Sequence, residues 1–283
     1  MAQNVRAIKS RIGNIQDIGQ ITKAMNAIAM TKVTRMKRRL SATRPYIEAL
    51  TAFAQRMVGR MADEDAAHPL TVPNESPIHA LFVLNADRGL CGRYKGDLNR
   101  ESETYVRSVD GDGSIIVGGE KARAYYARRD LPIAKTYAHV YDEPSEAIAA
   151  QIANELIDLY ERGDVGRIDL MYMRFSSDLA QRLIVEPFLP VSLDADANDD
   201  LIDPEAGAMF DVALRMLLRG TLYAALIETK TSEDALRRQA MKAATDNAED
   251  LVTSLTRAYN KARQQEITRE IADIIGGAEA LRS

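Results

Sequence analysis

The sequence predicts an α/β domain flanked by two long helices that pair with each other as an antiparallel coiled coil. Apolar residues recur at helical spacing near both ends of the 283-residue chain, and short apolar runs alternate with helical stretches in its middle. Acidic, proline-containing segments separate these regions. We therefore expect an N-terminal helix over 1–61, a linker over 62–77, an α/β domain over 78–190, a second linker over 191–204 and a C-terminal helix over 205–283.

The N-terminal region carries an apolar stripe of the coiled-coil type. Its members recur three or four residues apart, with a phase slip near Gly19: Ile8, Ile12, Ile15, Ile18, Ile21, Met25 and Ile28. This spacing keeps one face of a helix apolar along its whole length. We expect that face to be a packing seam.

The middle of the chain is expected to form a Rossmann-like, three-layer α/β domain. Apolar runs predict strands at Ile78–Leu84, Ser114–Val117, Arg167–Phe175 and Leu183–Leu189. Amphipathic patterns predict helices at Glu120–Arg129 and Ser145–Arg162. Strands that alternate with helices are typical of layered α/β folds.

The C-terminal region contains a heptad seam rich in small residues, which permits two helix backbones to approach closely. Its members are Met241, Ala244, Ala248, Leu251, Leu255, Ala258 and Ala262. Both long helices join the α/β domain at their inner ends, so they must run antiparallel if they pair.

The C-terminal helix is the longer of the two, so we expect its last turns to project beyond its partner. An apolar stripe would then be exposed there, formed by Ile267, Ile271, Ile274 and Ile275. An exposed stripe of this kind predicts a protein that surrounds it. The two long helices indicate mechanics or assembly more than chemistry.

The net charge of −4 hides an uneven distribution. Of the 37 basic and 41 acidic residues, ten basic residues and one acidic residue lie within 1–45. This basic region is compatible with nucleic-acid binding, with a solvated face, or with attraction to an acidic protein. The bases are interleaved with the Ile/Met stripe and no aromatic residue precedes Tyr46, which favours the protein partner over nucleic acid. Lys32, Arg35 and Arg39 share one helix face.

No motif indicates catalysis, a metal site or a cofactor. The Gly-x-Gly run at Gly111 precedes a strand instead of following one, so nucleotide binding is not expected. Cys91 follows the first predicted strand, but no histidine or second cysteine lies near it in sequence. We expect it to pack as a small apolar residue. One cysteine and three well-separated histidines do not favour a metal site.

The apolar runs are far shorter than the roughly 20 residues that a membrane-spanning helix needs. The first residues lack the apolar core of a signal peptide. The arginine-rich start continues without a break into the helical pattern, so we expect no transit peptide.

Six blocks of the sequence resemble the gamma subunit of F-type, rotary ATP synthases. The most specific block is 267–280, which reads ITREIADIIGGAEA and is similar to the family signature at every constrained position. The others, in chain order, are 21–25, 44–46, 87–92, 241–248 and 259–264. The resemblance covers essentially the whole chain.

The resemblance implies the central rotor stalk, a non-catalytic subunit without a cofactor. Such a stalk couples proton-driven rotation of the membrane c ring to ATP synthesis, or the reverse, at the catalytic sites of an alpha/beta hexamer. The implied partners are the alpha, beta and epsilon subunits and the c ring, with delta in the same complex, and no nucleic acid. The implied location is peripheral, at the cytoplasmic face of a bacterial plasma membrane.

The resemblance also assigns roles residue by residue. Contacts with beta fall on Arg238, Arg263, Gln264, Thr268, Glu270, Met25, Lys32 and Arg35. The tip in the apolar bearing of the hexamer falls on Ile271, Ile274 and Ile275. One departure follows Gly92, where the family usually has glycine, an apolar residue and asparagine, and this chain has Arg93, Tyr94 and Lys95.

Two other classes remain open from the residues alone. A basic coiled-coil protein that binds nucleic acid or acts as a scaffold is one. An enzyme built around Cys91 on the α/β domain is the other.

Overall fold

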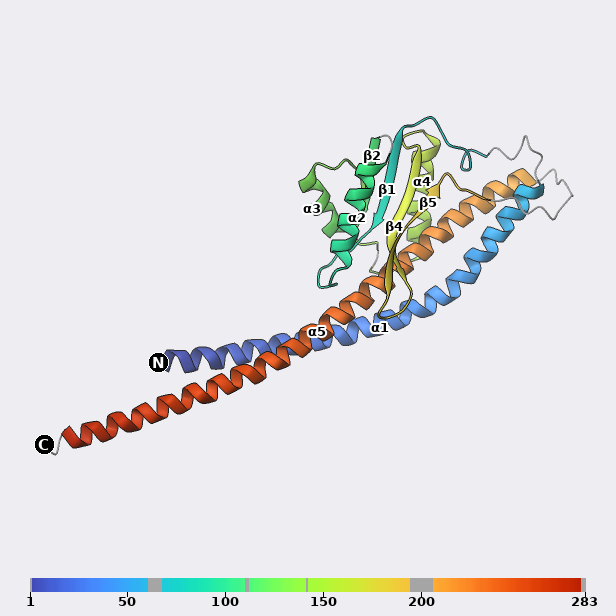
Figure 1. Cartoon of the computed structure of the whole chain (residues 1–283). Coiled ribbons are helices and arrows are strands. Elements are labelled where there is room, and N and C mark those ends of the chain that lie inside the picture. Colours follow the sequence, from blue (N-terminus) through green and yellow to red (C-terminus); the bar gives the residue numbers. More distant parts are fainter. Residues whose placement is uncertain (1, 61–67, 110–111, 141, 194–205, 281–283) are drawn as a thin grey trace. The chain divides into compact units, whose positions relative to one another are not determined.

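The computed structural model describes residues 2–60, 68–109, 112–140, 142–193 and 206–280 (Figure 1). The chain divides into two compact units. The sheet unit comprises residues 29–237, and the paired-helix unit comprises residues 1–28 together with 238–283. Two long helices, α1 (Ala2–Arg60) and α5 (Ala206–Ala280), contribute to both units.

The sheet unit is built on a five-stranded sheet in the order β3-β2-β1-β4-β5. Four strands are parallel: β1 (Ile78–Leu84), β2 (Asp112–Gly118), β3 (Ile133–Tyr137) and β4 (Arg167–Phe175). The edge strand β5 (Gln181–Leu189) runs antiparallel to β4. From β1 the chain builds outward through β2 and β3, then crosses to the other side of β1 for β4. The strand order therefore reverses between β1 and β4.

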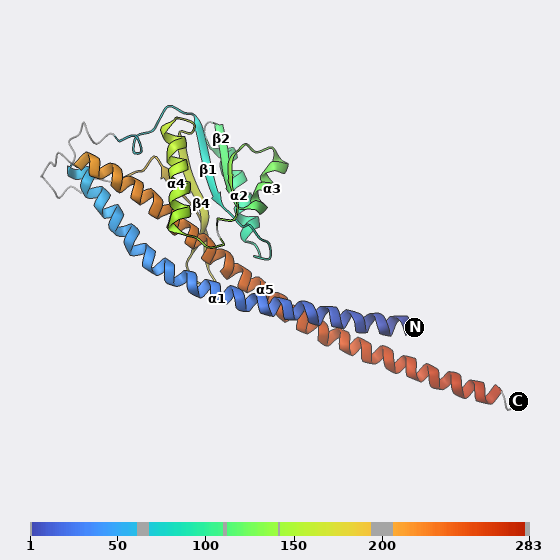
Figure 2. The same ribbon diagram turned by 180° about the vertical axis from the view of Figure 1, so that it is seen from behind.

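Helices cover both faces of this sheet (Figures 1 and 2). One face packs against α2 (Tyr94–Ser108) and α3 (Glu120–Tyr126), and a 3-10 turn at Ala127–Arg129 follows α3. The other face packs against α4 (Glu146–Glu161) and against the sheet-unit parts of α1 and α5. The fold class, an α/β sheet with long terminal helices, is as predicted.

The sequence of β1 explains its central position. Its last five residues, from Ala80 to Leu84, are completely buried, as a parallel strand covered on both faces requires. Successive side chains point to opposite faces. Phe82 and Leu84 accordingly join the core beneath α4, whereas Leu81 and Val83 join the core beneath α2 and α3.

Helix α4 begins where its sequence provides a cap. The Ser145 hydroxyl accepts a hydrogen bond from the Ile148 backbone N–H at 3.2 Å, which satisfies one of the free donors of the first turn. Six of its residues are buried, at spacings of three and four: Ala149, Ile152, Ala153, Leu156, Ile157 and Tyr160. The helix therefore packs one apolar stripe onto the sheet.

The strands predicted at Ile78–Leu84 and Arg167–Phe175 have those bounds in the structure. β2 is three residues longer than predicted and β5 begins two residues earlier, at Gln181. Two elements were not predicted: α2, whose sequence is mostly polar, and the short strand β3, which carries Lys135 among its five residues. Parts of both predicted linkers, 62–67 and 194–204, lie outside the described residues, as does residue 61 at the end of the predicted N-terminal helix.

The two helices of the paired-helix unit run antiparallel. Thr22 lies opposite Thr245, with their hydroxyl oxygens 2.8 Å apart, and a Cβ placed on Gly19 would lie 3.4 Å from the Ala248 Cβ. A step of three residues back along α1, from Thr22 to Gly19, therefore corresponds to a step of three residues forward along α5, from Thr245 to Ala248.

The predicted seam was wrong in part. Ile8, Ile12 and Ile15 are half-buried, but Ile18, Ile21 and Ile28 are 50–60% exposed. Beyond the phase slip the seam passes through Gly19 and Thr22, because small residues let the backbones approach. On α5, Leu251 and Ala258 are exposed, and Val252 and Tyr259 are half-buried in their place.

The described part of the chain contains no helix whose length and hydropathy would suit a membrane span.

Candidate functional site

The last described turns of α5 carry an apolar stripe that no described residue covers. Ile267, Ile271, Ile274 and Ile275 are 43%, 52%, 71% and 55% exposed. Four large apolar side chains gathered along three turns of helix cost free energy in water. The stripe is therefore a candidate binding surface for another protein.

The polar residues assigned to the same helix lie just before this stripe and along its first turn. Arg263, Gln264, Thr268 and Glu270 are all exposed, within about two turns of one another. The Thr268 hydroxyl donates to the Gln264 backbone carbonyl at 2.9 Å, a bond within the helix. Arg263 and Gln264 are consecutive in sequence and both exposed, so a partner could reach the guanidinium and the amide group.

Met25 and Arg238, the other assigned residues of the paired-helix unit, are half-buried. Near Met25, α1 presents a further apolar surface that the sequence interpretation assigned to the seam. It consists of Ile18, Ile21 and Ile28, each at least half exposed. The phase slip near Gly19 was the available signal, because the apolar stripe leaves the seam where its spacing changes.

The assigned bases of the sheet unit differ in their surroundings. Lys32 is half-buried on α1, and Arg35 is exposed and pairs with Glu143 at 3.2 Å. Arg39 donates to the Pro144 carbonyl at 3.1 Å, and Lys37 pairs with Asp178 at 2.6 Å. The basic region thus contacts its own α/β domain as well as presenting charge outward, which the sequence did not predict.

The carboxyl edge of the sheet is where layered α/β proteins bind ligands, at the point where the strand order reverses. Here that point lies between β1 and β4, and α5 occupies it. The Phe175 backbone N–H donates to the Glu228 carboxylate at 2.9 Å, and the Ser232 hydroxyl donates to the Met173 carbonyl at 2.8 Å. The position where a nucleotide fold would take its ligand is therefore filled by the chain itself.

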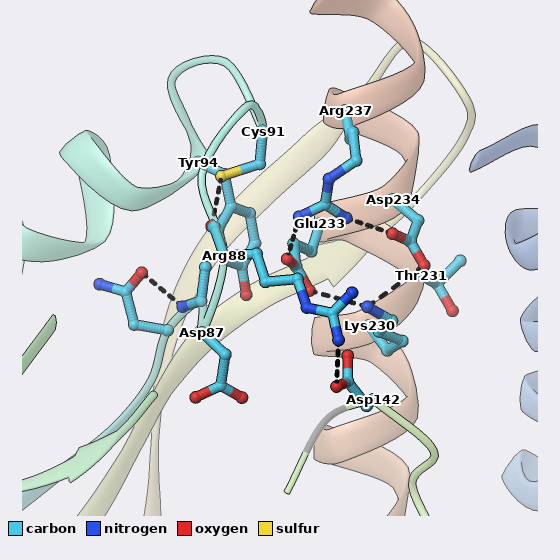
Figure 3. Close-up of polar contacts among 12 residues, drawn as sticks. Asp87, Arg88, Cys91, Tyr94, Asp142, Lys230, Thr231, Glu233, Asp234 and Arg237 are labelled. Atoms are coloured by element: carbon cyan, nitrogen blue, oxygen red, sulfur yellow. Dashed lines mark hydrogen bonds and ion pairs between the residues drawn. The ribbon is translucent and has the colours of Figure 1, made fainter. Parts of the chain in front are cut away.

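Cys91 lies in the loop after β1, beside this part of α5 (Figure 3). It is 2% exposed, and its thiol lies 3.8 Å from the Arg88 carbonyl. Burial, and then the negative charge of Glu233, raise the pKa of the Cys91 thiol. A raised pKa keeps the sulfur protonated and unreactive, which favours a packing role over that of a nucleophile.

Other titratable groups of the α/β domain serve its internal structure. The fully buried Asp169 carboxylate bonds to His79, Tyr105 and Arg167. In the part of the chain that the structure describes, no three His, Cys, Asp or Glu side chains converge to hold a metal ion.

Comparison with known proteins decides the family. A family model described as ATP synthase matches residues 4–281. An ATP synthase gamma chain from a Parafrankia strain is 36% identical, with 100% of this chain and 99% of the relative covered. The chain belongs to the ATP synthase gamma-chain family. A gamma chain from a Synechococcus strain is 34% identical, with 99% of each chain covered.

Solved structures agree with this gamma-chain fold. A chain of the Euglena gracilis mitochondrial ATP synthase, in a structure of OSCP, F1 and the c ring, has a TM-score of 0.70 at 20% identity. That match covers 99% of this chain and 95% of the other. A chain from the central stalk and c ring of the Tetrahymena thermophila enzyme has a TM-score of 0.60 at 20% identity, with 79% and 99% covered.

Proposed function

We propose that this gamma chain is the central rotor stalk of an F-type ATP synthase. It turns with the membrane c ring and drives the catalytic sites of the alpha/beta hexamer through different nucleotide affinities in turn. The chain itself performs no catalysis and needs no cofactor. Its partners are the alpha, beta and epsilon subunits and the c ring, with delta in the same complex.

The observation that carries this proposal is the uncovered isoleucine stripe at the end of α5. No described residue of the chain itself shields it, whereas an apolar collar in the hexamer would bury Ile271, Ile274 and Ile275 as a bearing. Burial of apolar area favours such association without fixing an angular position. A bearing needs contacts that do not fix an angular position, because the shaft must turn within it.

The polar residues around the start of the stripe have the opposite character. We propose that Arg263, Gln264, Thr268 and Glu270 make directional contacts with beta, joined by Arg238 and by Met25 and Lys32 on α1. Arg35 also belongs to this set once it is released from, or shared with, Glu143. Contacts that differ between beta conformations are what couple the angle of the shaft to nucleotide affinity.

The proposed location is the cytoplasmic face of a bacterial plasma membrane, where the complex holds the chain peripherally.

Reconstitution tests the function directly. The purified chain should not hydrolyse ATP, and its addition to alpha and beta subunits should raise their ATP turnover. Deletion of the chain from Ile271 onward should loosen assembly or coupling while the α/β domain stays folded. A full chain without effect on turnover would contradict the rotor role, and a truncated chain with full ATP-driven proton pumping would contradict the bearing.

A further inference from the structure

One segment of α5 combines a polar sequence with burial of all its residues. Every residue from 225 to 237 is buried. The polar and charged members are Glu228, Thr229, Lys230, Thr231, Ser232, Glu233, Asp234 and Arg237. A helix buried on all sides is normally apolar all round. The anchor segment, as we name residues 228–237, therefore has a polar role that burial alone does not explain.

The anchor segment is bonded to the carboxyl edge of the sheet at both of its ends. Near its start, Glu228 accepts from the Phe175 N–H at 2.9 Å and from Arg44 of α1 at 3.0 Å. In its middle, Ser232 donates to the Met173 carbonyl at 2.8 Å. At its end, the Arg237 guanidinium lies 3.5 Å from the Gly89 carbonyl in the loop after β1.

The charges within the anchor segment compensate one another (Figure 3). The Lys230 ammonium lies 3.2 Å from a Glu233 oxygen and 3.4 Å from an Asp234 oxygen, and Arg237 bonds to both acids. Two bases thus face two acids. Burial raises the pKa of Asp234 and Lys230 only partly opposes this, so the arrangement is costly. Buried ion pairs add little net stability, because the cost of removing both charges from water can exceed their attraction.

The opposite side of the anchor segment packs on α1. Val33, Met36 and Leu40 form one buried cluster with Phe175, Ile227 and Ala235. The segment is therefore enclosed by α1, the end of β4 and the loop after β1, all within the sheet unit.

We propose that the anchor segment is a positioning element that fixes α5 to the α/β domain in a single register, so that torque on one is delivered to the other. Apolar contacts alone are non-directional and permit sliding. Bonds from Glu228 and Ser232 to strand backbone, and buried ion pairs, are lost when the helix turns or shifts. The proposal rests on the rotor function proposed above.

Cys91 is a direct probe of the contact between the anchor segment and the sheet edge. It is the single cysteine of the chain and is buried against the segment. The double variant Glu228→Ala, Ser232→Ala removes two bonds to the sheet edge without touching Cys91. Alkylation of the thiol in the native full-length chain should accelerate about threefold or more, because local opening exposes it. The matched control is Ile157→Val, a core change on α4 whose melting temperature is compared with that of the double variant.

Coupling is then measured in the membrane-reconstituted complex, as protons pumped per ATP hydrolysed. The parent chain must first support pumping. If it does not, the result contradicts the rotor function and does not test the anchor segment. With the double variant, ATP hydrolysis in the presence of an uncoupler should stay within about twofold of the parent, while the pumping ratio falls to about half or less. Ile157→Val should keep the parental ratio.

Two results would overturn the proposal. One is a parental pumping ratio in the double variant, whether or not Cys91 reacts faster, because the segment would then be structural only. The other is an equal loss of ratio in Ile157→Val, because general destabilisation would then explain it. If the double variant does not assemble, Ser232→Ala alone is judged by the same criteria, since it removes one hydrogen bond and leaves every charge in place.

Discussion

Thr22 on α1 and Thr245 on α5 face each other with their hydroxyl oxygens 2.8 Å apart. Each hydroxyl also bonds within its own helix, Thr22 to the Gly19 carbonyl and Thr245 to the Met241 carbonyl. Two hydroxyl protons thus serve three acceptors, and Thr22 is only 8% exposed. This small polar layer, beside Gly19, brings the two backbones close together.

Gly19 offers a test of how close the helices are. A Cβ there would lie 3.4 Å from the Ala248 Cβ, so a methyl group fits but a larger side chain does not. Gly19→Ala should hold or raise stability by up to about 1 kcal/mol, since alanine favours a helix over glycine. Gly19→Leu should destabilise by about 1–3 kcal/mol through overpacking. Thermal melting of the full chain by circular dichroism measures both.

Gly13→Ala is the matched control, because a Cβ at Gly13 meets nothing within 4 Å. It should behave like Gly19→Ala. A Gly19→Leu chain as stable as the parent would mean that the helices do not pack closely at this layer.

The sequence predicted that two helices pair, that they run antiparallel and that the phase slips near Gly19, but it assigned the wrong residues to the seam around the slip. Counting large apolar residues selected Ile18 and Ile21, whereas the structure selects Gly19 and Thr22. A heptad pattern is recognised from large apolar residues, whereas two closely packed helices need small residues at their contact. A partner protein that covers the exposed isoleucines would explain why they are apolar. The sequence of one chain does not include that partner.

The exposed base Arg35 gives a prediction about partner binding. Its pair with Glu143 is exposed on both sides, 48% and 75%, so it contributes at most about 1 kcal/mol to folding. Arg35→Glu should therefore leave the chain folded but weaken its association with the alpha/beta hexamer. The loss should be larger at low salt than at high salt, since ions screen exposed charges. Binding titrations at two ionic strengths measure this.

Arg100→Glu provides the comparison, since it makes the same charge change at an exposed pair on α2, with Asp97 at 2.8 Å. It should leave the association and its salt dependence unchanged. Equal losses at both salt levels for Arg35→Glu would argue against an electrostatic role.

Within the α/β domain, prediction succeeded where burial dictates composition. β1 and the centre of β4 are apolar because helices cover both faces of the sheet, so their runs stand out. α2 was missed because only five of its residues are buried, and its exposed face is strongly polar. The anchor segment was missed for the opposite reason: its residues read as a solvated helix, and only the sheet edge around them reveals that they are buried.

The contact between the buried Asp169 and Tyr105 should make the stability of the chain depend on pH. Burial, and then the hydrogen bond to the Asp169 carboxylate at 2.7 Å, raise the pKa of Tyr105 to about 12. The folded chain therefore holds the phenol proton between about pH 10 and 12, where the unfolded chain has released it. By linkage this contribution to stability falls as the pH rises through that window and is complete below it. Asp169→Asn removes the carboxylate, so the pKa of Tyr105 should fall toward about 10.

Carbon-13 NMR of labelled tyrosine measures that pKa directly. Denaturant melts at about pH 9 and about pH 11 should show a smaller loss of unfolding free energy in Asp169→Asn than in the parent. Asp169→Asn should also lower stability at neutral pH, because His79 and Arg167 lose their buried anion. An unchanged Tyr105 titration would mean that burial alone sets its pKa.

Of the described glycines, Gly166 leaves the least room for a side chain, and it gives the last prediction. Gly166, just before β4, donates its N–H to the Ile78 carbonyl at 2.8 Å, and a Cβ on it would lie 2.0 Å from the Ser76 carbonyl oxygen. Because the obstacle is backbone, Gly166→Ala must displace the start of β1 or β4, at a cost of about 1–3 kcal/mol or more. Gly96→Ala in α2, where a Cβ meets nothing within 4 Å, should instead stabilise by up to about 1 kcal/mol. Urea melts of the two variants separate these outcomes, and a neutral Gly166→Ala would show that the two strand ends yield to each other without loss.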